Sequence, residues 1–157
     1  MAIMVKHYSL LLVIILSISL ISCSQLTKKD DVAYVKKNII ESFINKDIEK
    51  LKKIFNSELN KKNTIDKQIN ALFDSIEGKI ISYELNCLDG SEQEKVDNFK
   101  IIYSDLSPFI RKIITDKSKE YEIHCYYLRI DNENPNKVGV YRIAVYDLNN
   151  NILYEIK

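Results

Sequence analysis

The spacing of apolar residues changes once along this chain, at Lys79, and that change limits the folds available to it. Before Lys79 the apolar residues recur every three or four positions, as they do on amphipathic helices. After Lys79 they alternate with polar residues, which is typical of strands with one buried face. Parallel strands need crossover helices, and no helical pattern remains after Lys79 to supply them. The pattern therefore predicts helices followed by an antiparallel sheet.

Three helices are expected in the first part of the chain. Their apolar positions span residues 32–44, 48–59 and 65–76. Short polar residues stand where N-caps are needed: Asp30 and Asp31 before the first helix, Asp47 before the second, and Asn63-Thr64 before the third. Their side chains can accept hydrogen bonds from the first free amides of a helix. Gly78 is placed to end the third helix in a left-handed conformation.

Six strands are expected in the second part, separated by turns rich in Gly, Pro, Asn and Asp. Their ranges are 80–87, 98–104, 109–115, 120–130, 138–147 and 152–156. Residues 31–157 are thus expected to form a single α+β domain, with three N-terminal helices packed on a curved, mainly antiparallel sheet.

Residues 1–22 have the layout of a signal peptide. A polar start with Lys6 and His7 precedes an apolar run over 8–21, and the small residue Ser22 follows. The run is shorter than the ~20 residues that a membrane-spanning helix needs. A removable signal peptide is therefore favoured over a retained membrane helix.

The segment Leu20-Ile21-Ser22-Cys23 resembles the lipobox of bacterial lipoproteins, which has a small residue before the cysteine and an aliphatic residue three places before it. The resemblance implies that residues 1–22 are removed and that Cys23 carries acyl chains such as palmitate. Residues 23–30 would then be the lipidated cysteine and a short tether, and the protein would be a lipid-anchored lipoprotein on the extracytoplasmic face of the cell membrane. The alternative is an ordinary signal peptide followed by a chance cysteine.

Charge and composition exclude several classes of function. Without residues 1–22 the chain has 22 Lys and Arg against 22 Asp and Glu, so it offers no basic surplus for nucleic acid. Three glycines leave little room for phosphate-binding loops. One histidine, His124, remains beyond the signal peptide, which is too few for a zinc site. The acidic turn over 131–136 lacks the glycine and the final glutamate of a calcium-binding loop, so a plain turn is favoured there. We expect no cofactor and no metal.

The order of segments resembles a family of Gram-positive lipoproteins described as a domain of unknown function, over roughly 34–146. The resemblance rests on Glu77-Gly78-Lys79-Ile80 before the first strand, on Tyr83 and Cys87 within it, and on 131–135 before Val138-Gly139. The tight helix pair around 43–51 is similar to the cone-shaped folds named after nuclear transport factor 2, a cystatin-like shape. The resemblance implies a fold and a location but no catalytic residues.

The number and position of the tyrosines indicate a binding function. The chain has ten Tyr and no Trp, and seven of the tyrosines fall on the later strands. Tyr and Arg are enriched at interfaces, although tyrosine also suits a half-buried strand. The candidate residues for binding a small ligand or a protein partner are Tyr126, Arg129, Tyr141 and Arg142. Immunity to a secreted toxin is one version of this hypothesis.

Two further hypotheses concern single side chains. His124 with a carboxylate such as Asp105 could act as a base in a small enzyme of the isomerase or dehydratase type. Cys87 and Cys125 could form a disulfide in an exported domain, the alternative being two buried free thiols. The binding module is favoured over the enzyme, because the chain lacks a nucleophile motif, a metal set and a phosphate loop.

Overall fold

The computed structural model describes residues 31–85 and 90–157. The chain divides into two units, residues 1–34 and residues 35–157. The expected signal peptide, the tether and Cys23 lie outside the described residues, as does Cys87. Within the described ranges, no helix has the length and apolar character needed to span a bilayer.

Helices come first in the described residues. Residues 31–45 are helical, and α2 (Ile48–Lys52), α3 (Ser57–Asn60) and α4 (Ile65–Asp74) follow. The Asp47 carboxylate caps α2 by accepting a hydrogen bond from the Lys50 amide at 2.9 Å. The Asn56 side chain caps α3 in the same way, through the Leu59 amide at 2.9 Å. The helix expected over 48–59 is therefore two helices with a break between them.

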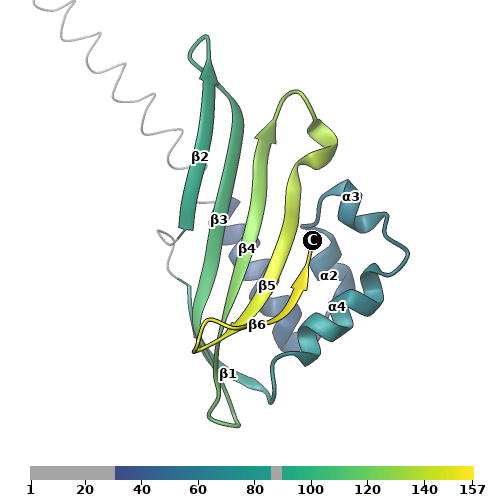
Figure 1. Ribbon diagram of the computed structural model, residues 1–157, viewed down its shortest axis with the longest axis vertical. Helices are drawn as coiled ribbons and strands as arrows, with labels where there is room; N and C mark the ends of the chain where they lie inside the picture. The colour runs from purple at the N-terminus through teal and green to yellow at the C-terminus, as the bar shows by residue number, and fades with distance from the viewer. Residues whose placement is uncertain (1–30, 86–89) are drawn as a thin grey trace, which may run out of the picture. The chain divides into compact units, whose positions relative to one another are not determined.

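The second half forms a six-stranded antiparallel sheet (Figure 1). The strands are β1 (Ile80–Glu84), β2 (Gly90–Asp97), β3 (Lys100–Thr115), β4 (Glu120–Asp131), β5 (Gly139–Asp147) and β6 (Ile152–Ile156). Their order is β1-β3-β4-β5-β6, and β2 also pairs with β3, beyond β1 along the same strand. A 3-10 turn, η1 (Pro135–Lys137), joins β4 to β5.

The expected fold of three helices on a cone-shaped sheet is wrong, because the molecule is sheet-rich and its helices are few and short. The expected strands 98–104 and 109–115 are one strand, β3, since Pro108 lies within the ladder opposite Gly90 and not in a turn. Strand β2 was not expected at all. Each of its residues is exposed, so it carries none of the alternation that marks a half-buried strand.

The core lies between the helices and the sheet. Phe43 of the first helix and Phe73 of α4 meet edge to face, with ring centroids 5.1 Å apart. They pack in one cluster with apolar side chains of β3, β4, β5 and β6, among them Ile110, Ile123 and Ile143. Burial of these side chains fixes the middle of the sheet against the helices.

A short backbone pairing holds the helical segment to the edge of β5. The Val140 amide donates to the Ile54 carbonyl at 2.8 Å, and the Asn56 amide donates to the Val140 carbonyl at 2.9 Å. Gly139 makes this approach possible, because a Cβ there would lie 2.7 Å from the Asn56 amide nitrogen. The pairing places α3 and η1 beside the end of β5.

Candidate functional site

A cavity of about 300 Å³ lies where β3, β4 and β5 meet α3 and η1. It is lined by Asn56, Glu58, Tyr103, Asp105, Leu128, Lys137 and Tyr141. Its volume is at the lower end of the range of about 300–1,000 Å³ that is typical of small-molecule sites. We call it the Asp105 cavity.

Two β-bulges shape this end of the sheet. Ser104 pairs with Ile130 and Asp105 with Leu128, so Arg129 is an extra residue on β4. In the same way, Tyr141 is an extra residue on β5, between positions that pair with Tyr126 and Tyr127. A bulge re-aims the side chains around it, and bulges are frequent beside functional sites.

The Asp105 carboxylate is the polar centre of the cavity. Its Oδ2 accepts hydrogen bonds from the Tyr141 hydroxyl at 2.9 Å and from the Tyr103 hydroxyl at 3.3 Å. Its Oδ1 is buried and accepts no hydrogen bond from any group that the structure describes. A buried acceptor without a partner costs about 1–3 kcal/mol. Asp105 lines the cavity, and an unpaired buried acceptor of this kind is where a water or an ion is expected to bind.

Both tyrosines are held as hydrogen-bond donors. Burial raises the pKa of the Tyr141 hydroxyl, and its hydrogen bond to Asp105 raises it further. Burial and the Asp105 charge also raise the pKa of Tyr103. Each phenol therefore stays protonated at neutral pH and donates its hydrogen bond to Oδ2.

Cys125 lies close enough to Asp105 for the carboxylate charge to affect the pKa of its thiol. The thiol is free and buried, and burial raises its pKa well above the usual range. The Asp105 charge raises this pKa further, while the buried Lys36 lowers it. Cys125 is thus an unreactive thiol at neutral pH. Its disulfide with Cys87 stays a prediction.

The buried thiol leads to a prediction about alkaline stability. An unfolded chain ionises Cys125 at its usual pKa of about 8.5, whereas the folded chain keeps the proton. The stability that this thiol contributes is therefore present below about pH 8.5, and it is lost as the pH rises towards the higher folded pKa, by up to about 1.4 kcal/mol per pH unit.

We expect the free energy of unfolding, measured in urea between about pH 8.5 and pH 10, to fall less steeply with pH in Cys125→Ala than in the wild type. The upper bound keeps ordinary tyrosine titration, near pH 10, out of the comparison. Equal slopes in the two proteins would show that Cys125 does not titrate differently in the folded state.

His124 lies in a separate cluster of aromatic rings. Its ring centroid is 5.4 Å from that of Phe109 and 4.4 Å from that of Tyr146. Its Nε2 lies 2.9 Å from Oε2 of Glu122. The carboxylate partner of His124 is thus Glu122, and the expected partner Asp105 binds tyrosines instead. His124 lines neither of the two cavities described here.

The four predicted binding residues are only partly brought together. The rings of Tyr126 and Tyr141 are 6.1 Å apart, and the Arg142 guanidinium lies 4.6 Å from the Tyr126 ring centroid. Arg142 is also ion-paired with Glu155, so it is not open to an anionic ligand. Of the four, Tyr141 alone lines the Asp105 cavity.

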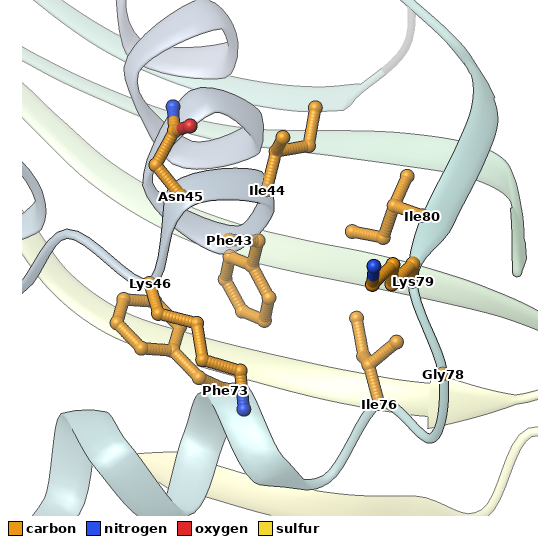
Figure 2. A pocket seen from close by; sticks show the side chains of 9 residues that line it. All are labelled: Phe43, Ile44, Asn45, Lys46, Phe73, Ile76, Gly78, Lys79 and Ile80. Atoms are coloured by element: carbon orange, nitrogen blue, oxygen red, sulfur yellow. The ribbon is translucent and has the colours of Figure 1, made fainter.

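A second cavity, of about 490 Å³, lies between the end of the first helix and the segment that enters β1 (Figure 2). Most of the side chains around it are apolar, and Figure 2 shows Phe43, Ile76 and Ile80 pointing into it. At its edge the Lys46 ammonium is paired with Asp74 at 2.6 Å. This cavity offers shape and apolar surface but no acceptor comparable with Asp105.

The sequence carries one signal for the Asp105 cavity that our sequence analysis missed. Tyr103 and Asp105 are two positions apart on one strand, so their side chains share a face. Asn56, Glu58 and Lys137 had no such signal, because only the folded chain brings them near β3. In the described part of the chain, no three His, Cys, Asp or Glu side chains gather in a way that could hold a metal ion.

Comparison with known proteins identifies a family but no function. The model of a family described as "Domain of unknown function (DUF5104)" matches residues 38–149. No curated protein matches the chain.

Proposed function

The chain belongs to the DUF5104 family, and we propose that it is a lipid-anchored binding module for a small ligand that presents an ammonium group. The proposed anchor is Cys23, and the proposed location is the extracytoplasmic face of the cell membrane of a Gram-positive bacterium. The ligand site is the Asp105 cavity. The protein acts by binding and not by turnover.

The lipobox-like segment supports the anchor. Ser22 and Leu20 stand at the two positions before Cys23 that this motif requires. An acylated cysteine followed by the short segment 24–30 would keep the domain close to the bilayer. Confinement there raises the effective concentration of a binder for ligands that arrive at the same surface.

The unpaired, buried Oδ1 of Asp105 is the observation on which the proposed ligand class rests. It is a buried carboxylate oxygen, and a hydrogen bond from a cationic donor such as an ammonium group to a carboxylate is roughly twice as strong as one between neutral groups. The rings of Tyr103 and Tyr141 belong to the same lining, and aromatic faces also attract cations. The charged side chains of the lining are Asp105, Glu58 and Lys137, so the cavity carries a net negative charge.

The position of His124 favours a binding protein over an enzyme that uses His124 as its base. A catalytic base must lie within reach of a bound substrate. His124 stacks on Phe109, makes a tilted contact with Tyr146 and lies 2.9 Å from Glu122, and it lines neither of the two cavities described above. Asp105, by contrast, lines a cavity and accepts hydrogen bonds from two tyrosine hydroxyls.

Asp105→Asn tests the ligand site. The substitution keeps the shape of the side chain and removes its charge, so we expect the affinity for n-butylammonium to fall at least tenfold, which is about 1.4 kcal/mol. Stability is expected to be maintained, because the amide places no unpaired charge in the cavity. Isothermal titration calorimetry and thermal unfolding measure the two quantities.

Asp74→Asn is the matched control, because Asp74 is an exposed carboxylate at the edge of the other cavity. It should bind n-butylammonium as the wild type does. Equal affinity in wild type and Asp105→Asn would rule out the Asp105 cavity as the ligand site.

A further inference from the structure

The turn between β2 and β3 holds an aromatic residue where the backbone favours glycine. Asp97 and Lys100 form the last pair of the hairpin, so Asn98 and Phe99 make a two-residue turn. Both have positive φ, 47° for Asn98 and 61° for Phe99. Turns of this kind prefer Asn followed by Gly, because a side chain at the second position is strained. Asn98 follows the preference and Phe99 departs from it.

The fold gains nothing in return for this strain. Phe99 is fully exposed, and its neighbour Val96 is 64% exposed. Figure 1 shows the β2–β3 hairpin extending past the end of β4, so no other strand covers its tip. A strained residue without a packing role is a sign of a role outside the fold.

The chemistry of the tip favours a bilayer surface as the partner. The apolar Val96 and Phe99 share the tip with Lys95, Asp97 and Lys100, which give residues 95–100 a net charge of +1. The Lys95 ammonium lies 5.3 Å from the Tyr103 ring centroid. Membrane-surface elements combine side chains such as Trp, Phe and Leu with Lys or Arg, and the amines attract anionic headgroups. Val96 and Phe99 alone are too small for a stable protein interface, which buries about 800 Å² on each partner.

We propose that the β2–β3 tip, residues 95–100, inserts Phe99 into the headgroup region of an anionic membrane. The inference rests on the proposed lipid anchor, since one aromatic side chain binds a bilayer only weakly by itself. The anchor supplies a high local concentration, and the tip then fixes one orientation of the domain on the membrane.

The absence of Trp from the chain gives a direct test. Phe99→Trp places a single indole at the tip of the processed, lipid-anchored protein. This protein is then reconstituted in phosphatidylglycerol vesicles with brominated acyl chains. We expect the Trp emission to shift to shorter wavelength and to be quenched by the bromines. Leu148→Trp is the matched control, because Leu148 is 65% exposed in the turn between β5 and β6. Its emission should stay that of an indole in water.

Flotation of the same vesicles separates two kinds of failure. If the protein floats with the vesicles but Phe99→Trp is not quenched, the tip does not enter the bilayer and the inference is overturned while the anchor stands. If the protein does not float, the anchor is absent and the inference falls with it. Phe99→Gly should unfold at the same temperature as the wild type or at a higher one, and a lower midpoint would contradict the strain on which the inference depends.

Discussion

Cys23→Ala should move the protein from the membrane fraction to the soluble fraction. Two acyl chains hold a protein stably on a bilayer, because each buried methylene contributes about 0.8 kcal/mol. Alanine has no thiol to accept them. Cell fractionation with immunodetection measures the distribution, and incorporation of labelled palmitate reports the acylation itself.

Ser24→Ala is the control, because it changes a neighbouring side chain and leaves the thiol in place. It should remain in the membrane fraction and incorporate palmitate as the wild type does. Recovery of Cys23→Ala in the membrane fraction as fully as the wild type would remove the lipid anchor from the account.

Gly139→Ala should destabilise the domain strongly. The φ of Gly139 is 124°, which residues with a side chain rarely adopt. The new Cβ would lie 2.7 Å from the amide nitrogen and 2.9 Å from the Cα of Asn56, and neither backbone atom can move without breaking the pairing with Val140. We expect the free energy of unfolding to fall by about 3 kcal/mol. Urea unfolding followed by circular dichroism measures it.

Val138→Ala is the control for this position, because Val138 is next to Gly139 and exposed. It should change the free energy of unfolding by less than about 0.5 kcal/mol. A similarly small change for Gly139→Ala would mean that residues 54–56 are not held against β5. The Asp105 cavity would then lose the element that positions Asn56 and Glu58.

The sequence predicts those features of the fold that depend on residues close together in the chain. Asp47 caps α2 as expected, and strands begin at Ile80, next to the change of period at Lys79. The single helix expected over 48–59 does not form, because residues 54–56 pair with Val140, more than eighty positions away. Propensity alone does not show such a contact.

The site was harder to predict than the fold, because it depends on two bulges. Period-two alternation assigns each side chain to a face only if the register is unbroken. The extra residues Arg129 and Tyr141 interrupt that register on β4 and β5. Asp105 therefore meets Tyr141 across the sheet and not the His124 with which the sequence analysis paired it.

Titration of the ¹⁵N-labelled wild type with n-butylammonium, followed by NMR, tests the ligand site most directly. The probe presents one ammonium on a short apolar chain, and butyrate is a control of similar size and opposite charge. We expect saturable chemical-shift changes at the amides of Asp105, Leu128 and Tyr141 with n-butylammonium and none with butyrate. Shift changes at these amides with butyrate alone, or none with n-butylammonium, would contradict it.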